Sequence, residues 1–327
     1  MAKKEGQRYR ISRKQSKKLR RSAQKLRKRP AYSKKRKAKK NKTLNFPLIL
    51  LILLLGGLLI WKHYTKPKPY LAADDTLAVH FIDVGQGDCT LLACDGKIML
   101  IDCGEYQYLG RVEEYLKDRG IKRIDYLVAT HPHSDHMGGM AGIVKDFSIG
   151  RVIMPPLADW ETPTAVYFEK FLDACADKGC SIDIAEIGDV MELGDARAEV
   201  IAPAHTGYED LNDSSVALMV THGSKSFLLT GDAEMTSEKE MLLGGRLHHV
   251  NVYKAGHHGS SSSSSAAFLA VIQPDIAVIS CGSKNPYGHP SVSALKRLSR
   301  YTNRIYRTDT DGTIVLESDG KVLRIIK

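Results

Sequence analysis

The segment Thr130–Gly139 reads Thr-His-Pro-His-Ser-Asp-His-Met-Gly-Gly and follows an apolar run at 126–129. A helical pattern begins at His136, so the segment is expected on a loop between a strand and a helix. Three imidazoles and a carboxylate within six residues are costly to crowd together unless a cation gathers them. Neutral imidazole and carboxylate are good ligands for zinc and similar first-row ions. The segment therefore predicts a metal site, and a chance surface cluster is the alternative.

The alternation of residues within this segment indicates which side chains share an ion. In an extended loop, His131 and His133 point the same way and can hold one metal. Asp135 and His136, at the start of the helix, can turn toward a second metal. Two divalent ions about 3.5–4 Å apart would clamp a water molecule and a substrate oxygen. We expect zinc or manganese in this role, with Asp135 also orienting the attacking hydroxide.

Short apolar runs alternate with helical segments around this motif, from Leu77 to the end of the chain. This pattern predicts β-rich sheets with helices packed outside them, an α+β or α/β layout. The expected strands are 78–82, 90–93, 98–101, 126–129, 151–154, 198–201, 216–220, 226–229, 250–253, 276–280 and 313–316, and the expected helices are 110–119, 136–145, 165–178, 235–243 and 292–300. The serine run at 260–265 is expected to be a loop that leads into a helix. The cysteines are expected to be free thiols, with a Cys175–Cys180 disulfide as the alternative.

Charge is unevenly distributed along the chain. Residues 1–45 hold 21 of the 48 Lys and Arg and one of the 37 acids, which leaves 27 basic and 36 acidic residues for the remainder. A tail of about +20 is thus joined to a body of about −9. Residues 1–43 contain almost nothing to bury and predict a disordered tail. Attraction to anionic lipid is the favoured role of this tail, and nucleic-acid binding is the alternative, weakened because Tyr9 and Tyr32 are its sole aromatic residues.

Residues 44–61 form an apolar run without a charged residue, which nearly spans a hydrocarbon core of about 30 Å. We expect a transmembrane anchor at 44–64, since the run is long for a signal peptide and no Ala-x-Ala-like site follows closely. A cleaved signal peptide and a buried core helix are the alternatives. The positive-inside rule then predicts a cytoplasmic tail and a single-pass membrane protein with its body outside the cell. Residues 65–76, with Lys66-Pro67-Lys68-Pro69, are expected to be a linker.

The His-x-His-x-Asp-His pattern after a short strand resembles the metal-binding motif of the metallo-β-lactamase superfamily, and the resemblance covers residues 77–327. It implies a four-layer αββα sandwich with a di-metal site at one edge of the sheets. Further positions match the family pattern in the same order along the chain. Asp102 would accept a hydrogen bond from a ligand histidine, and Asp232, at the end of Phe227–Asp232, would bridge both metals. The run Lys254–Ser260 resembles the last histidine motif, in which we expect His257 as the ligand and His258 as an adjacent alternative.

One departure from the family pattern concerns the first metal. The family has a further metal-binding histidine before the bridging aspartate, but residues 208–216 contain none. Asn212 or Asp213 would take the vacant place, and the resulting oxygen-rich ligation would favour manganese over zinc. His205 lies a little upstream, and His222 is expected to be a surface strand residue.

Three further stretches, at 80–88, 211–216 and 285–290, resemble the hydrolase domain attached to ComEC-type DNA-uptake channel proteins. The resemblance implies a polar loop of Asp83, Gln86 and Asp88 near the metals. It also suggests His289 as a group that supports the site or protonates the leaving group. A purely structural role, in capping or in the core, is the alternative. This chain has one apolar span in place of the many-helix channel, so we expect a detached hydrolase domain on a single anchor.

These observations favour an extracellular, metal-dependent phosphodiesterase or nuclease that acts on a phosphodiester, with DNA as a candidate substrate. The metals would be held by His131, His133, Asp135, His136, Asp232 and His257. A β-lactamase-like or other ester hydrolase is the second hypothesis. A non-enzymatic surface module of a DNA-uptake complex is the third, although an acidic body argues against broad contact with a polyanion.

Overall fold

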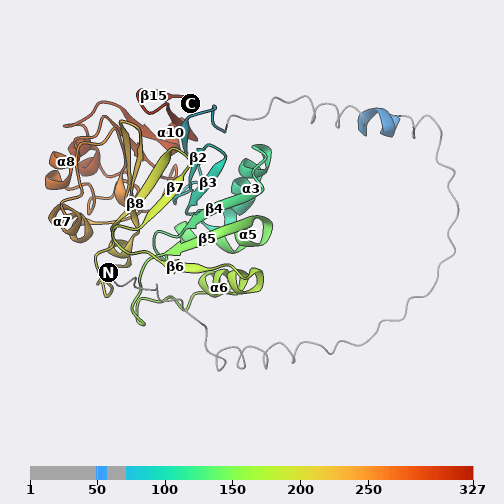
Figure 1. Cartoon of the computed structure of the whole chain (residues 1–327), viewed down its shortest axis with the longest axis horizontal. Coiled ribbons are helices and arrows are strands. Elements are labelled where there is room, and N and C mark those ends of the chain that lie inside the picture. The colour runs from blue at the N-terminus through green and yellow to red at the C-terminus, as the bar shows by residue number, and fades with distance from the viewer. Residues whose placement is uncertain (1–48, 50, 57–70, 327) are drawn as a thin grey trace. The chain divides into compact units, whose positions relative to one another are not determined.

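The computed structural model describes residues 49, 51–56 and 71–326 (Figure 1). Its contacts divide the chain into two units, one that holds residues 71–326 and one that holds residues 49 and 51–56. The predicted tail at 1–43 and most of the predicted anchor and linker lie outside the described residues. Within residues 49, 51–56 and 71–326, no helix is long and apolar enough to cross a membrane. The anchor stays a prediction.

The first sheet of the large unit contains eight strands in the order β15-β14-β1-β2-β3-β4-β5-β6. Their bounds are β1 Leu77–Phe81, β2 Thr90–Cys94, β3 Lys97–Ile101, β4 Arg123–Val128, β5 Ser148–Met154, β6 Ile182–Ile184, β14 Ile314–Ser318 and β15 Leu323–Ile325. Strands β3 to β6 run parallel, and the remaining pairs are antiparallel. Because β3 and β4 are parallel, the chain leaves both at the same edge of the sheet.

The second sheet contains seven strands in the order β13-β12-β11-β10-β9-β8-β7. Their bounds are β7 Val190–Leu193, β8 Ala196–Ala202, β9 Ala217–His222, β10 Lys225–Leu229, β11 Val252–Lys254, β12 Ile276–Ile279 and β13 Ile305–Arg307. Strands β10 to β13 run parallel, whereas β7 to β10 pair antiparallel. The parallel half of this sheet therefore also has one carboxyl edge and one amino edge.

Helices cover the outer face of each sheet (Figure 1). They are η2 Tyr106–Tyr108, α3 Leu109–Asp118, α4 Ser134–Met137, α5 Met140–Asp146, α6 Val166–Lys178, η3 Leu211–Ser214, α7 Met235–Leu243, η4 Gly256–Gly259, α8 Ala266–Ile272, α9 Val292–Leu298 and α10 Thr308–Asp311. Helices α3, α5 and α6 share a buried cluster with the first sheet, and α7 and α8 share one with the second.

The main core lies between the sheets and follows from the two-residue period of the strands. In β2, Leu91 and Ala93 join the cluster beneath the helices, whereas Leu92 and Cys94 join the cluster shared by both sheets. Side chains of a strand point alternately to its two faces, so a strand of entirely apolar residues can serve both layers. The expected four-layer αββα sandwich is confirmed.

Most expected elements form within a few residues of their predicted bounds, and the exceptions have physical causes. The helix expected at 136–145 is two helices, α4 and α5, separated at Gly138 and Gly139. A Cβ on Gly139 would lie 2.8 Å from the carbonyl oxygen of Cys103, so close backbone packing explains the break. Four short strands, β6, β7, β13 and β15, were not expected, because three- or four-residue strands leave little periodicity. All six cysteines are free, as expected.

Candidate metal centre

The loop after β4 brings its histidines and its carboxylate into the interior. His133 has an extended backbone and precedes α4, so Asp135 and His136 occupy the first turn of that helix. His131 and His136 are fully buried, and their ring centroids lie 4.1 Å apart. His131 Nε2 lies 3.0 Å from His133 Nδ1. Four side chains of the types that ligate metals are thus held together by one short loop.

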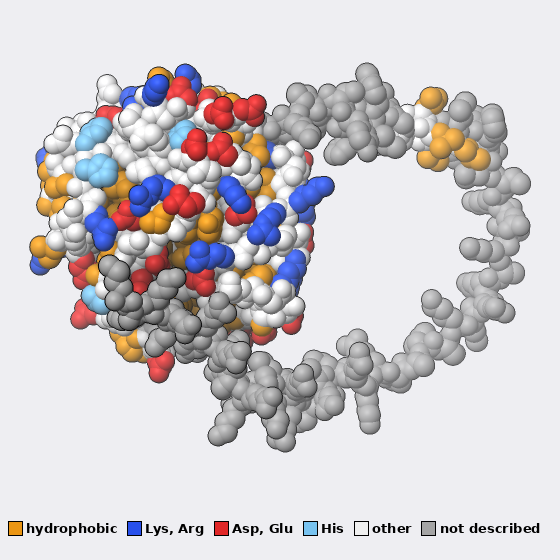
Figure 2. All heavy atoms as spheres, in the orientation of Figure 1, with side chains coloured by type: hydrophobic (Ala, Val, Ile, Leu, Met, Phe, Trp, Pro, Cys, Tyr) orange, Lys and Arg blue, Asp and Glu red, His pale blue; other side chains and the backbone are white. Residues whose placement is uncertain are grey.

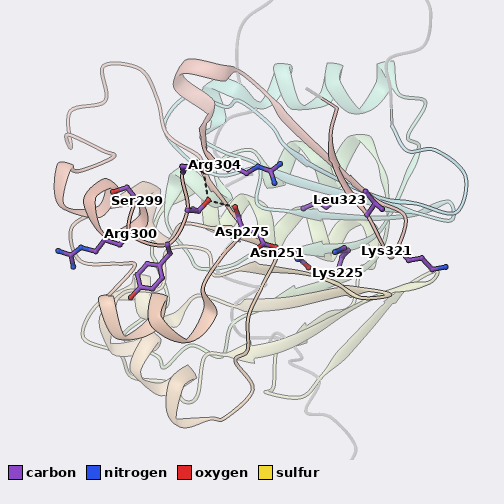
Figure 3. Close-up of a pocket in the computed structure, with 12 residues that line it drawn as sticks. Lys225, Asn251, Asp275, Ser299, Arg300, Arg304, Lys321 and Leu323 are labelled. Atoms are coloured by element: carbon purple, nitrogen blue, oxygen red, sulfur yellow. Dashed lines mark hydrogen bonds between the residues drawn. The ribbon is translucent and has the colours of Figure 1, made fainter.

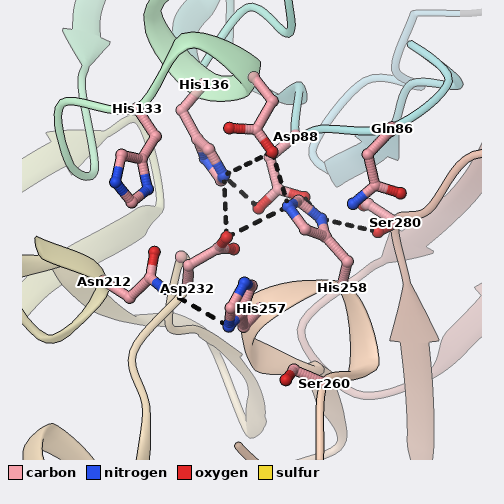
Figure 4. Close-up of polar contacts among 12 residues, drawn as sticks. Gln86, Asp88, His133, His136, Asn212, Asp232, His257, His258, Ser260 and Ser280 are labelled. Atoms are coloured by element: carbon pink, nitrogen blue, oxygen red, sulfur yellow. Dashed lines mark hydrogen bonds and ion pairs between the residues drawn. The ribbon is translucent and has the colours of Figure 1, made fainter. Parts of the chain in front are cut away.

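Asp135, His136, Asp232 and His258 form a compact group in which one ligand atom from each lies within 4.8 Å of the others (Figure 4). Asp232 Oδ2 lies 3.1 Å from both His136 Nε2 and His258 Nε2. His258 Nε2 lies 3.2 Å from Asp135 Oδ2. Because Asp232 follows β10 and His258 follows β11, these side chains reach the α4 loop from the carboxyl edge of the second sheet.

The polar atoms of this group fit a bound cation. His136 Nε2 and Asp232 Oδ1 are buried and have no hydrogen-bond partner among the residues that the structure describes. A buried polar atom without a partner is costly, and a divalent ion would satisfy both atoms. Two imidazoles and two carboxylates are a suitable donor set for zinc or manganese.

Contacts behind the group orient both imidazoles. His136 Nδ1 lies 2.7 Å from Asp102 Oδ2, and Asp102 also accepts from the backbone and hydroxyl of Thr130. His258 Nδ1 lies 3.0 Å from the carbonyl oxygen of Ser280, to which it can donate. Each ring therefore keeps Nε2 free to face the centre, an arrangement typical of metal-ligating histidines. Asp102 lies where the sequence predicted a supporting carboxylate.

The electrostatics of the group are those of opposite charges buried together. Burial by itself would lower the pKa of His136, but the attraction of three carboxylates, first Asp232, raises this pKa well above its ordinary value. The pKa of His258 is raised in the same way, chiefly by Asp232. Burial would raise the pKa of Asp232, but His136 and His258 hold it well below its ordinary range. A divalent ion would take over the positive charge of the two imidazoles, which bind metal in neutral form.

Beside this group, Lys254 is fully buried and contacts Asp88 of the loop predicted to be polar. Lys254 Nζ lies 2.5 Å from Asp88 Oδ2 and donates to the carbonyl oxygens of Gly231 and Ala255. Asp88 Oδ1 lies 3.5 Å from His258 Nδ1. The role of Lys254 was not predicted from the sequence, although a lysine inside the apolar run at 250–255 is a signal that could have indicated it.

The other two members of the predicted polar loop accept hydrogen bonds from nearby backbone groups, and Gln86 is drawn with the compact group in Figure 4. Asp83 accepts from the backbone of Gly85 and lies 3.3 Å from Arg111. Gln86 Oε1 accepts from the backbone of Gly282. These two side chains hold loops together.

His257, which the sequence analysis preferred over His258 as a ligand, lies outside the compact group. Its Nδ1 lies 2.7 Å from Glu234 Oε1, and its side chain is 24% exposed against 1% for His258. Both histidines adopt left-handed backbone conformations, with φ of 45° and 53°. This tight turn directs the second histidine inward, so the structure brings His258 rather than His257 to Asp232.

Asn212 and Asp213, the candidates for the missing histidine position, have different surroundings. Asn212 Oδ1 is buried without a hydrogen-bond partner in the described part of the chain. Asp213 Oδ1 accepts from the backbone of Glu234 and Ser237 at the start of α7. Asp213 therefore acts at a helix terminus, and Asn212 is the one whose oxygen is free to meet an ion (Figure 4).

His289 lies next to these histidines, as the sequence predicted, although in a structure without a substrate its role stays a prediction. Its ring centroid lies 5.1 Å from that of His257 and 6.3 Å from that of His258. Burial, with the two neighbouring imidazoles, lowers the pKa of His289 to about 4. Asn285 Oδ1 accepts from the backbone of His289 and shapes its loop. Two other histidines of the sequence analysis lie elsewhere: His205 pairs with Glu240, and His222, expected at the surface, is buried against Ser318.

Two facing sheets covered by helices, with histidines and carboxylates gathered at the carboxyl ends of their parallel strands, define the class of two-sheet metallohydrolase folds. The chain belongs to the metallo-beta-lactamase superfamily, whose sequence profile matches residues 82–283. That range includes the whole compact group.

Three curated relatives confirm the likeness to ComEC-type proteins. ComE operon protein 3 of Bacillus subtilis is 32% identical over 262 residues, 75% of this chain and 33% of that protein. Recombination protein 2 of Haemophilus influenzae is 30% identical, over 81% of this chain and 31% of that protein. Competence protein ComA of Neisseria gonorrhoeae is 28% identical, over 80% and 34% respectively. The chain spans about one third of the length of these relatives.

Solved structures match the fold at low sequence identity. The metallo-beta-lactamase fold protein YhfI from Bacillus subtilis has a TM-score of 0.50 and 12% identity, over 74% of this chain and all of that one. CmlA, a diiron beta-hydroxylase from Streptomyces venezuelae, has a TM-score of 0.50 and 13% identity, over 76% of this chain and 55% of that one. These likenesses concern the arrangement of the sheets and helices.

Proposed function

We propose that this chain is a membrane-anchored phosphodiesterase or nuclease that uses two divalent ions to activate water. The observation that carries the proposal is the compact group of Asp135, His136, Asp232 and His258, with buried atoms that lack partners in the described residues. When bound, divalent ions would supply a water molecule of lowered pKa and stabilise charge on a phosphoryl oxygen.

Residues of this chain would bind the ions, orient the ligand side chains and donate a proton. Asp135, His136, Asp232 and His258 would hold one ion, and His131, His133 and Asn212 would hold the other together with Asp232. Asp102 and the Ser280 carbonyl keep two imidazoles oriented through their Nδ1 atoms. His289, beside the group, is the candidate proton donor to the leaving oxygen, a role that requires the negative charge of a bound phosphodiester to raise its pKa from about 4 toward neutrality.

Manganese is the favoured metal. Asn212 would offer an amide oxygen where relatives of the fold offer an imidazole, and oxygen ligands suit manganese better than zinc. Zinc is the second choice, because four histidines and two carboxylates complete the proposed ligand set.

A phosphodiester substrate is supported by the names of the relatives. One of them is named as a competence protein and one as a recombination protein, which points toward DNA. The anchor at 44–64 and the tail of about +20 would place the domain outside the cell by the positive-inside rule.

The test uses the full-length chain purified in detergent, with neighbouring histidines as a matched pair. His258→Ala should lose bound manganese or zinc, measured by elemental analysis, whereas His257→Ala should keep the metal content of the unmodified protein. Asp135→Ala with Asp232→Ala should abolish metal-dependent cleavage of single-stranded DNA and of a simple phosphodiester. Equal metal content and equal rates in all of these proteins would contradict the proposal. Turnover of nitrocefin without phosphodiester cleavage would replace the substrate class by lactams.

A further inference from the structure

A pocket of about 650 Å³ lies at the amino ends of the same parallel strands whose carboxyl ends carry the metal centre (Figure 3). Lys225 begins β10, Asn251 precedes β11, and Arg304 precedes β13. Lys225 and Leu229 are the two ends of β10, roughly 13 Å apart at about 3.3 Å per residue, and Asp232 follows beyond Leu229. The pocket is therefore separate from the compact group of ligands.

Four cationic side chains line this pocket: Lys225, Arg300, Arg304 and Lys321. Within the part of the chain that the structure describes, none of them forms an ion pair or a side-chain hydrogen bond. Every other described arginine has a carboxylate, carbonyl or aromatic partner. The two arginines without a partner are thus gathered at one place.

Asp275 is the single carboxylate in the lining, so against four cations it leaves a formal excess of three positive charges. Asp275 Oδ2 accepts from Asn251 Nδ2 at 2.7 Å, and its Oδ1 lies 3.1 Å from His249 Nε2. Elsewhere on the domain, acidic and basic side chains are interspersed, as the face in Figure 2 shows. Uncompensated cations around a concave surface focus a positive potential, which attracts anions.

We infer that this pocket binds the phosphate groups of a nucleic-acid strand, at a distance from the proposed site of cleavage. Arginine and lysine are the side chains that contact backbone phosphates. Tyr301 in the lining is partly buried against the cluster that α7 and α8 share with the second sheet, and its hydroxyl donates to the Ala266 carbonyl, so a base can contact the part of the ring that stays exposed. A lipid surface fits less well as the ligand, because the lining offers little apolar surface for acyl chains. Its aliphatic side chains are Val322 and Leu323. The choice of nucleic acid as the ligand rests on the proposed function; the site itself does not.

The experiment uses the full-length chain in detergent, with EDTA present so that cleavage plays no part. A single-stranded oligonucleotide that contains 5-iodouracil is photo-crosslinked, and the crosslinked peptides are measured by mass spectrometry. The peptide with Tyr301 should carry a crosslink, and Tyr9 and Tyr32 of the basic tail provide an internal reference. Arg300→Gln with Arg304→Gln should reduce the Tyr301 crosslink roughly tenfold relative to that reference. Lys145→Gln with Lys170→Gln, which removes the same charge from α5 and α6, should leave it unchanged.

Two results would overturn the inference. One is a Tyr301 crosslink that is absent in the unmodified protein or equal in both double variants. The other is binding to vesicles with phosphatidylglycerol that the arginine variant loses, without any oligonucleotide crosslink at Tyr301. Failure of the proposed function gives a different result: the oligonucleotide crosslinks at Tyr301, but manganese does not lead to its cleavage.

Discussion

The two ends of strands β10 to β13 handle charge in opposite ways. At the carboxyl ends, Lys254, Asp88 and Asp232 are buried, and each lies within 3.1 Å of an oppositely charged or ionisable partner. At the amino ends, Arg300 and Arg304 are exposed and, among the described residues, have no such partner. Burial makes an unpaired charge very costly, whereas water tolerates it at a surface. The charges at the carboxyl ends are therefore paired inside the fold, whereas the cations at the amino ends are left accessible to a ligand.

The largest effect that would test this comparison is expected at the buried pair. Lys254→Met should lower the free energy of unfolding by about 3–5 kcal/mol, because it leaves Asp88 buried without its cation. Chemical denaturation of the full-length protein measures this change. The double variant Asp88→Leu with Lys254→Met should be less destabilised than the single variant, because it removes both charges. A single variant within about 1 kcal/mol of the unmodified protein would show that the pair is not needed.

A second prediction compares two buried histidines. His80 is buried, with its Nε2 2.6 Å from the Leu71 carbonyl and its Nδ1 2.8 Å from the Tyr115 hydroxyl. Burial lowers its pKa to about 4, the opposite of the shift at His136. Between pH 6.5 and 4 the unfolded chain therefore binds a proton that the folded protein excludes, and stability falls as the pH falls.

This contribution of His80 amounts to about 3 kcal/mol over that interval. Denaturation curves at several pH values measure it, and the dependence in His80→Gln should be shallower by about this amount. Identical pH dependence in both proteins would contradict a neutral, buried His80.

A third prediction concerns the carboxylate behind the centre. Asp102→Asn keeps the shape of the side chain but loses its charge, so His136 is held less firmly. Metal affinity should fall by about 10–100-fold. Competition with a fluorescent chelator measures the affinity, and Asp83→Asn, in the loop outside the compact group, serves as the control. Equal affinities for all three proteins would remove the supporting role of Asp102.

The smallest effect on the free energy of unfolding is expected at the amino ends of the strands. Arg300→Gln with Arg304→Gln should change the free energy of unfolding by less than about 0.5 kcal/mol, because neither side chain has a partner to lose among the described residues. Arg246→Gln, which breaks the ion pair with Glu199, is a suitable comparison at about 0.2–1 kcal/mol. A loss of several kcal/mol in the double arginine variant would mean that these arginines support the fold instead.

Several features of the centre could be read from local sequence. His131, His133, Asp135 and His136 lie on one loop, so their proximity follows from chain connectivity alone. Asp102 and Asp232 each follow an apolar strand directly, and parallel strands bring their carboxyl ends to a shared edge. The alternation of short apolar runs and helical segments was likewise enough to predict the layered sandwich.

The choice between His257 and His258 was decided by tertiary structure. The two residues are identical in type and adjacent, and the left-handed turn that directs His258 inward depends on packing around η4. The contact between Lys254 and Asp88 joins residues far apart in sequence, and the basic pocket gathers side chains from several strand starts. Sequence determines which groups a strand end carries, because that depends on neighbours along the chain. Which of those groups meet depends on how sheets pair and pack, which no single segment specifies.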